Sequence, residues 1–138
     1  MIIMKKRIPL LLLLSFFTLF SCNDFFECIT NKRPEIHDAT FRRGEVGVYY
    51  YAEVTTEIKN EPRDNDYGYF YELYGELPDG MQMFVNYRTV SFEGVPEVPG
   101  RYTFTLGLYV DPPIDGDGFQ EVMCTDYTSK DFSILIEE

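Results

Sequence analysis

Apolar and polar residues alternate with a period of two along most of the chain after residue 43. The longest alternating run begins at Gly44 and continues to Ile58. One face of this run carries Val46, Val48, Tyr50, Ala52, Val54 and Ile58, and the other carries Glu45, Tyr49, Tyr51, Glu53 and Glu57. Side chains of a strand point alternately to opposite faces of a sheet, so the run predicts a half-buried strand.

The same alternation recurs in shorter runs that are separated by turn-forming residues. These runs cover residues 67–73, 81–85, 90–92, 101–110 and 132–136. The run at 101–110 is the most regular, because one face carries Tyr102, Phe104, Leu106, Leu108 and Val110. No segment after residue 21 shows the spacing of an amphipathic helix. Short strands joined by turns predict an all-β domain, either an antiparallel sandwich or a barrel.

Two turn patterns carry a resemblance to a known family. The first is Tyr71-Glu72-Leu73 followed by Leu77-Pro78-Asp79-Gly80-Met81, and the second is Phe92-Glu93-Gly94-Val95-Pro96 followed by Gly100-Arg101-Tyr102-Thr103-Phe104. Together they resemble the Ig-like domains of bacterial surface proteins, which are related to cadherin-like and dystroglycan-type modules. The resemblance implies one Ig-like antiparallel β-sandwich over residues 34–138, and it implies no activity, because the shared residues are folding devices.

The first residues have the layout of a secretion signal. Lys5, Lys6 and Arg7 precede an apolar run from Ile8 to Phe20, and no acidic residue occurs before Asp24. A basic start followed by a short apolar stretch is typical of a signal peptide. The run is too short to be a comfortable permanent bilayer span, which needs ~20 apolar residues. We therefore expect a signal peptide at residues 1–21.

The end of this run resembles a second family pattern. Leu19-Phe20-Ser21-Cys22 is similar to the lipobox of bacterial lipoproteins. The resemblance implies cleavage before Cys22, diacylglyceryl on its thiol and a further acyl chain such as palmitate on the new amino terminus. Two or more chains anchor a protein stably on a membrane. Asn23 differs from the aspartate associated with inner-membrane retention, which favours the outer membrane, in the periplasm or at the cell surface. Residues 22–33 would be a tether.

Charge excludes some partners. The predicted signal peptide holds three of the 12 basic residues and none of the 23 acidic ones, so the mature chain would have nine basic residues and a net charge of −14. Nucleic acid is repelled by such a surface, because phosphate binding needs Lys and Arg. The expected partners are the membrane, through the lipid, and an envelope protein or glycan.

Two cysteines remain once Cys22 is assigned to lipid. Cys28 and Cys124 form an even pair in an exported protein, which favours a disulfide between them. Two free thiols are the alternative, because the cysteines are far apart in sequence and a disulfide demands close Cα atoms.

Candidates for chemistry are few. The single histidine, His37, has no nucleophile elbow near it in sequence, and one histidine with two cysteines cannot form a typical zinc site. We expect no enzyme activity. An acidic loop carries the carboxylates of Asp111, Asp115, Asp117 and Glu121 beside two glycines, which are residue types that calcium sites use, although the spacing is not that of an EF-hand. The alternative is a solvated hairpin tip.

Tyrosines on the faces opposite the expected core are the other candidate ligand-binding residues. Tyr49, Tyr51 and Tyr109 can stack on sugar rings or anchor a protein partner, or they can cover a sheet face. The sequence thus predicts a non-enzymatic, lipid-anchored envelope lipoprotein that acts in binding or assembly. A carbohydrate-binding or adhesive lipoprotein and an inhibitor of an envelope enzyme are the alternatives.

Overall fold

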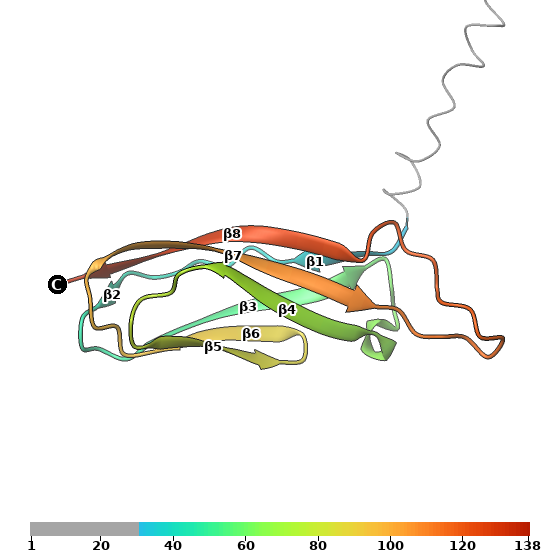
Figure 1. The fold of residues 1–138 in the computed structure, drawn as a ribbon, viewed down its shortest axis with the longest axis horizontal. Coiled ribbons are helices and arrows are strands. Elements are labelled where there is room, and N and C mark those ends of the chain that lie inside the picture. The colour runs from blue at the N-terminus through green and yellow to red at the C-terminus, as the bar shows by residue number, and fades with distance from the viewer. Residues whose placement is uncertain (1–30) are drawn as a thin grey trace, which may run out of the picture. The chain divides into compact units, whose positions relative to one another are not determined.

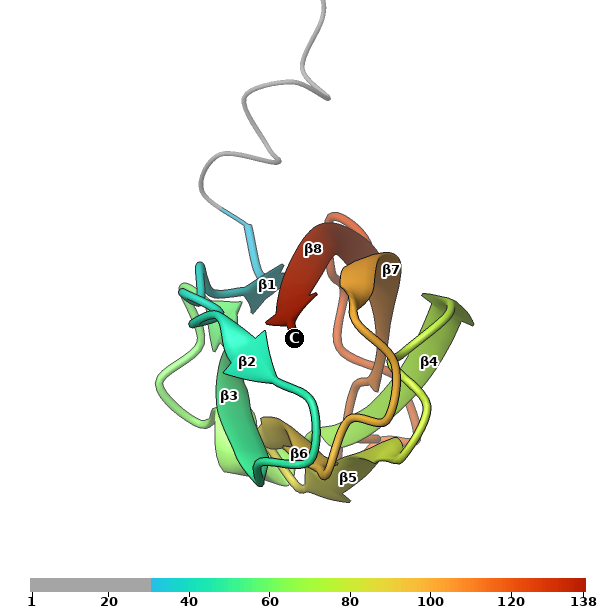
Figure 2. The same ribbon diagram turned by 90° about the vertical axis from the view of Figure 1, so that its left-hand side faces the viewer.

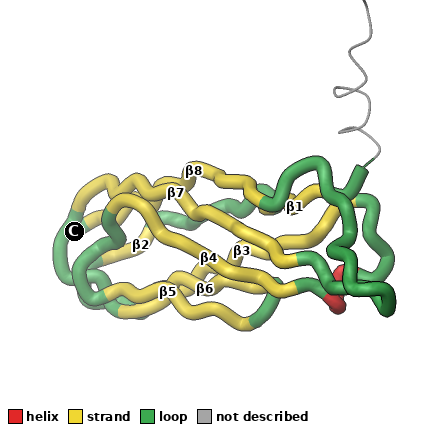
Figure 3. The backbone as a smooth tube through the Cα atoms, turned by 45° about the vertical axis from the view of Figure 1, so that its right-hand side comes forward, coloured by secondary structure: helices red, strands yellow, loops and turns green. Residues whose placement is uncertain are grey.

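A computed structural model describes residues 31–138, in which the secondary structure is almost entirely strand (Figures 1 and 3). The predicted signal peptide, Cys22 and Cys28 lie outside the described residues. No helix among residues 31–138 is long and apolar enough to cross a membrane. The elements are β1 (Arg33–Ile36), β2 (Gly44–Glu45), β3 (Tyr50–Lys59), the 3-10 helix η1 (Asp64–Asp66), β4 (Gly68–Gly75), β5 (Met81–Asn86), β6 (Thr89–Gly94), β7 (Gly100–Asp111) and β8 (Tyr127–Glu137).

The strands form two four-stranded sheets with the orders β1-β3-β6-β5 and β2-β8-β7-β4. The strand pairs are antiparallel, except that β2 pairs with β8 in parallel. The view along the strands in Figure 2 shows the two sheets on opposite sides of one interior. The described residues therefore adopt an all-β, sandwich-like fold, which confirms the all-β prediction and favours the sandwich over the barrel.

The core lies between the sheets and follows the predicted alternation. Val54, Val90 and Leu106 have no exposed surface, and neither do Leu108 or Ile134. Phenylalanine rings from both sheets meet at the centre, where the Phe92 and Phe104 ring centroids are 4.8 Å apart. Burial of these side chains contributes ~2–3 kcal/mol each to folding.

The alternation from Gly44 to Ile58 is interrupted where the sequence predicts one continuous strand. Residues 46–49 form a turn between β2 and β3, and Val46 and Val48 are 37% and 53% exposed instead of buried. The cause is local backbone bonding, because Val46 N–H donates to the Glu137 carbonyl at 3.0 Å and Gly47 N–H donates to the Pro96 carbonyl at 2.9 Å. The prediction that Val46 and Val48 face the core is therefore wrong.

The sheet includes a residue before the predicted domain boundary at residue 34. Arg33 already pairs with Lys59 in the ladder between β1 and β3, although residues 22–33 were expected to form a tether. Pro34 lies inside β1, which is the outer strand of its sheet. An edge strand tolerates proline because the missing N–H can face away from the neighbouring strand.

Close backbone contacts hold one end of the sandwich, which we call the turn end. Met81 N–H donates to the Pro78 carbonyl at 3.0 Å, and Val95 N–H donates to the Gly80 carbonyl at 3.1 Å. A Cβ atom on Gly94 would lie 2.1 Å from the Gly80 carbonyl oxygen, and Gly94 has φ +146°. Both predicted turns thus form, and glycine is required at Gly94 by space and by backbone conformation.

Candidate functional site

The three tyrosines singled out from the sequence are exposed, but the structure does not bring them together. Tyr51 points outward from β3 and Tyr49 lies in the loop before it, whereas Tyr109 is on β7 in the other sheet. The Tyr49 hydroxyl donates to Glu93, and this hydrogen bond raises the pKa of the Tyr49 phenol. The Tyr51 hydroxyl donates to Glu53 at 2.7 Å. Each tyrosine of this face is thus already paired with a carboxylate.

The outer face of β4, β7 and β8 has a different organisation, in which exposed aromatic side chains form a row across three strands. Phe70 on β4 is the register partner of Tyr109 on β7, and Tyr109 is the register partner of Tyr127 on β8. Their exposed fractions are 56%, 44% and 41%. The Phe70 and Tyr109 ring centroids are 6.4 Å apart. Tyr74, which is 51% exposed, belongs to the same face two rows further along β4.

A glycine between these rings lets them lie close to the sheet. Gly107 is at the outward position of β7 between Glu72 and Ser129 in the register, and it has no side chain. A Cβ atom there would lie 3.0 Å from the Tyr127 hydroxyl oxygen and 3.4 Å from Cε2 of Tyr74. The two tyrosine rings therefore lean over Gly107 from opposite neighbouring strands and form a shallow aromatic surface. We call Phe70, Tyr74, Tyr109 and Tyr127 the aromatic face.

Polar groups continue the same surface beyond Tyr74. A shallow pocket of about 580 Å³ is lined there by Tyr74 and by hydroxyl and carboxylate side chains of β7 and β8, which are Thr103, Thr105, Asp131 and Ser133. The Thr105 hydroxyl donates to Asp131 at 2.6 Å. Carboxylates also lie beside the rings, because Tyr74 donates to Glu72 and the charge of Asp126 raises the pKa of the Tyr109 phenol.

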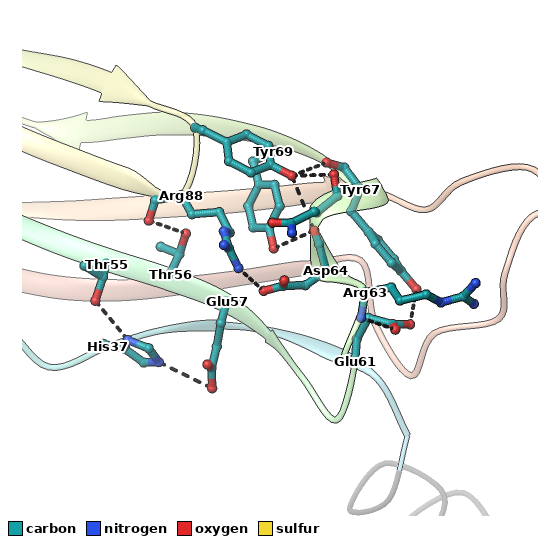
Figure 4. Close-up of polar contacts among 12 residues, drawn as sticks. His37, Thr55, Thr56, Glu57, Glu61, Arg63, Asp64, Tyr67, Tyr69 and Arg88 are labelled. Atoms are coloured by element: carbon teal, nitrogen blue, oxygen red, sulfur yellow. Dashed lines mark hydrogen bonds and ion pairs between the residues drawn. The ribbon is translucent and has the colours of Figure 1, made fainter.

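An ion network holds the end of the sandwich where the described chain begins, which we call the ionic end. The Lys32 ammonium contacts the carboxylates of both Glu61 and Glu121. The Tyr67 hydroxyl donates to Glu61 at 3.1 Å and to Glu121 at 2.8 Å. Arg63 N–H donates a third bond to Glu61 at 2.8 Å. Figure 4 shows Glu61, Arg63 and Tyr67 of this network.

Charge explains the protonation states in the ionic end. Glu61 is only 8% exposed, and its hydrogen bond with Lys32 is the main cause that lowers its pKa. A second hydrogen bond from Lys32, to Glu121, is the main cause that lowers the pKa of Glu121. Burial, followed by the two hydrogen bonds to the carboxylates, raises the pKa of the Tyr67 phenol. Both carboxylates are ionised and the phenol stays protonated at neutral pH. The cluster is thus a stable ion network, and its groups do not form an acid and base pair that could exchange a proton near neutral pH.

His37 sits in a surface contact. One ring nitrogen lies 2.9 Å from the Thr55 hydroxyl, and the other lies 3.4 Å from a carboxylate oxygen of Glu57 (Figure 4). Close by, Arg88 in the turn between β5 and β6 contacts the carboxylate of Asp64 in η1. The first pair of contacts joins the segment after β1 to β3, and the second joins the turn between β5 and β6 to η1.

The four carboxylates proposed as calcium ligands do not converge. Asp115 accepts hydrogen bonds from the backbone of Asp117 at 3.0 Å and of Phe119 at 2.8 Å, which closes the tip of the loop. Asp111 accepts a bond from Gln120 at 2.9 Å, while Glu121 faces Lys32. Within residues 31–138 no group of three His, Cys, Asp or Glu side chains could hold a metal ion. The geometry matches the alternative of a solvated hairpin tip.

Cys124 lies beside the start of the described chain. Its N–H donates to the Lys32 carbonyl at 3.0 Å, so the loop before β8 and the chain entering β1 run together. Cys124 is disulfide-bonded and is not a free thiol. The other two cysteines, Cys22 and Cys28, lie outside the described residues, so the pairing of Cys28 with Cys124 stays a prediction.

The chain matches no family model and no curated protein.

Proposed function

We propose that this protein is a non-enzymatic, lipid-anchored lipoprotein of the bacterial cell envelope, in which one Ig-like sandwich serves as a binding module. The observation that carries the binding role is the aromatic face. Its four large rings are 41–56% exposed on regular strands. Exposed aromatic rings held on a rigid sheet provide large contact areas at a small cost in side-chain entropy.

The strand order supports the Ig-like part of the proposal. In Ig domains one sheet has the strand order A-B-E-D and the other contains C, F and G. The orders β1-β3-β6-β5 and β2-β8-β7-β4 correspond to this arrangement if β1 and β2 are two halves of the first strand. Near the start of β7, the Tyr102 hydroxyl donates to the Val98 carbonyl at 3.1 Å. This contact corresponds to the tyrosine corner that recurs at the start of strand F.

The lipid anchor is supported by the sequence Leu19-Phe20-Ser21-Cys22 after a basic and apolar start. The first described residues belong to the ionic end. The aromatic face runs along the side of the sandwich, where a partner in the envelope could reach it.

The pairing of Cys28 with Cys124 fits this arrangement. The backbone N–H of Cys124 donates a hydrogen bond to the Lys32 carbonyl. Lys32 is only a few residues after Cys28 in the sequence. If lipid occupies Cys22, Cys28 is the only cysteine left to be the partner of Cys124. The disulfide would then fix the tether to the loop before β8.

The anchor is tested by labelling bacterial cells that express the full chain with a fatty-acid analogue. We expect label on the wild type and none on Cys22→Ala, which should also keep its signal peptide. A Ser15→Ala variant is the matched control, because it changes the signal outside the lipobox and should be labelled normally. Label that persists in Cys22→Ala would refute the anchor.

The binding role is tested by crosslinking the anchored protein to neighbouring envelope components in intact cells. We expect the wild type to capture a defined component, and Phe70→Ala combined with Tyr109→Ala to lose it. The second candidate function, a carbohydrate-binding or adhesive lipoprotein, is favoured by the hydroxyl and carboxylate groups beside the rings. An inhibitor of an envelope enzyme would instead capture an enzyme. Capture that is unchanged in the double variant would remove the aromatic face from the proposal.

A further inference from the structure

We propose that the outer face of β4, β7 and β8 binds a neutral glycan chain, whose pyranose rings stack on the row Phe70, Tyr109 and Tyr127 while its hydroxyls bond the polar groups alongside. The inference deepens the proposed binding function, because it names the class of ligand that the aromatic face takes. It concerns the β4-β7-β8 face alone and does not depend on the lipid anchor.

The dimensions of the face suit a chain of sugars. Outward positions repeat every two residues, so the row of Tyr109 and the row that contains Tyr74 and Thr105 are separated by four residues, or ~14 Å along the strands. This length exceeds one pyranose ring. Aromatic rings stand at both ends of that distance, and the Tyr74 and Tyr127 rings lie close to the sheet between them because Gly107 has no side chain.

The polar groups match what a pyranose ring exposes. A pyranose has apolar C–H faces that stack on aromatic rings and a rim of hydroxyls that both donate and accept hydrogen bonds. Here carboxylates that only accept stand next to the rings, with Glu72 beside Tyr74 and Asp126 beside Tyr109. At the far end, Thr105 and Asp131 line the pocket of about 580 Å³ and are already oriented by their mutual hydrogen bond of 2.6 Å. Alternating stacking surfaces and acceptors are typical of a site for a neutral polyol.

Charge selects among the possible ligands. The mature chain would have a net charge of −14, and the carboxylates of Glu72 and Asp131 lie on this face, with Asp126 next to Tyr109. Polyanionic glycans such as polyuronates would therefore be repelled. A protein partner would need to desolvate these carboxylates, whereas the centre of a protein interface is usually depleted in charge. Sugar hydroxyls instead donate hydrogen bonds to the carboxylates and leave them partly hydrated.

The opposite face of the sandwich supplies a matched comparison. Tyr51 on β3 is 53% exposed, which is similar to Tyr109, but its register partners are the polar residue Glu93 on β6 and, beyond it, Gln82 on β5. No row of rings crosses the described strands there. A variant at Tyr51 therefore removes an exposed tyrosine without touching the proposed site.

The test uses the full chain, expressed with its own signal and extracted in a detergent without sugar headgroups. Four neutral hexasaccharides are titrated by calorimetry, those of β1,4-glucose, β1,4-N-acetylglucosamine, β1,4-xylose and β1,4-mannose, with hexagalacturonate as the anionic control. Because the chain has no Trp, tyrosine emission reports ring stacking in a parallel measurement. We expect at least one neutral hexamer to bind, its disaccharide to bind more weakly, and hexagalacturonate not to bind.

Variants assign the binding to the aromatic face. Tyr127→Ala should weaken binding about tenfold or more, since the variant removes one of the three rings of the stacking row. Tyr127→Phe keeps the ring and should bind within a few-fold of the wild type, and Tyr51→Ala should bind like the wild type. Gly107→Ala places a methyl group under both tyrosine rings and should weaken binding with little change in the melting temperature, because Gly107 faces away from the core.

Four results would overturn the proposal. They are binding of none of the neutral hexamers, binding of hexagalacturonate alone, equal loss in Tyr51→Ala and Tyr127→Ala, and capture of an envelope protein that is lost in Tyr127→Ala while no glycan binds. The last result would convert the aromatic face into a protein interface and leave the proposed binding function intact. A failure of lipidation would refute the anchor without affecting the glycan titration.

Discussion

The two ends of this sandwich are stabilised by different kinds of interaction. At the turn end, backbone atoms approach so closely that the structure has no room for a Cβ at Gly94. At the ionic end, one ammonium group, two carboxylates and a phenol connect the start of β1 to two long loops. Backbone packing does not change with pH or salt, whereas an ion network changes with both. The end at which the described chain begins is thus the end whose stability pH and salt can change.

The largest loss of folding stability is expected from a substitution at the turn end. Gly94→Val should lower the free energy of unfolding by about 3–5 kcal/mol, because a Cβ would lie 2.1 Å from the Gly80 carbonyl and φ is +146°. The midpoint of urea unfolding measures this loss. Gly116→Val is the matched control, since a Cβ there meets no atom within 4 Å. Equal stability of Gly94→Val and the wild type would mean that the turn end is not closed as described.

The proposed disulfide comes next and belongs to the ionic end. Cys28→Ser should lower the free energy of unfolding by about 2–4 kcal/mol, because a crosslink over a long loop restricts the unfolded chain. Alkylation followed by mass spectrometry, with and without reductant, shows whether Cys28 and Cys124 are bonded. If both thiols react without reductant, the pairing is wrong, and Cys28→Ser should then be as stable as the wild type.

A smaller loss of stability is expected when Lys32, the cation that contacts both carboxylates of the ionic end, is replaced. Lys32→Met should destabilise the domain by about 2 kcal/mol, since it leaves two carboxylates facing each other, and the Glu61 side chain is only 2% exposed. Lys59→Met is the control, because its pair with Glu35 is 43% and 35% exposed and should contribute less than ~1 kcal/mol. Equal losses in the two variants would show that burial of Glu61 has no energetic consequence.

The smallest effect is the pH dependence that separates the two ends. Glu61 and Glu121 have folded-state pKa values below 4.5, so their stabilising contribution is present above that pH and is lost as the pH falls through the folded-state pKa values. Unfolding free energies measured from pH 7 to pH 3 should therefore fall in the wild type and fall less steeply in Lys32→Met. The slope should be unchanged in a mild turn-end variant such as Val95→Ala, because the Val95 side chain is 43% exposed. A wild-type slope equal to that of Lys32→Met would contradict the network.

Much of the fold could be predicted from the sequence because burial follows a period of two. The inward set of β7 was predicted correctly, and its residues Phe104, Leu106 and Leu108 are buried. Val46 and Val48 were not, because a glycine turn after β2 changes the alternation, and β1 was missed because Pro34 was interpreted as a break. Local patterns do not show which strand becomes an edge.

The candidate site could be predicted only in part. Tyr109 was identified from its position opposite the core, but Phe70, Tyr74 and Tyr127 were not. The alternation of β4 already places Phe70 and Tyr74 on the outward side, so that signal was present in the sequence. The sequence does not show which strands are neighbours. The row of rings exists only because β7 lies between β4 and β8. The ionic end combines residues from three separate segments, and no spacing in the sequence predicts that combination.

The direction in which β1 leaves the domain determines how the protein would bear a mechanical load. β1 runs along the length of the sandwich from the ionic end, and its four residues pair with β3. If a bound glycan pulls on the aromatic face while lipid holds Cys22, the proposed Cys28–Cys124 disulfide would pass the force to the loop before β8. In the reduced protein the force would instead act along β1 and perpendicular to its interstrand hydrogen bonds with β3. Bonds loaded in this direction share the force instead of opening one after another. The position of β1 at the sheet edge would thus keep the module resistant to traction even without the disulfide.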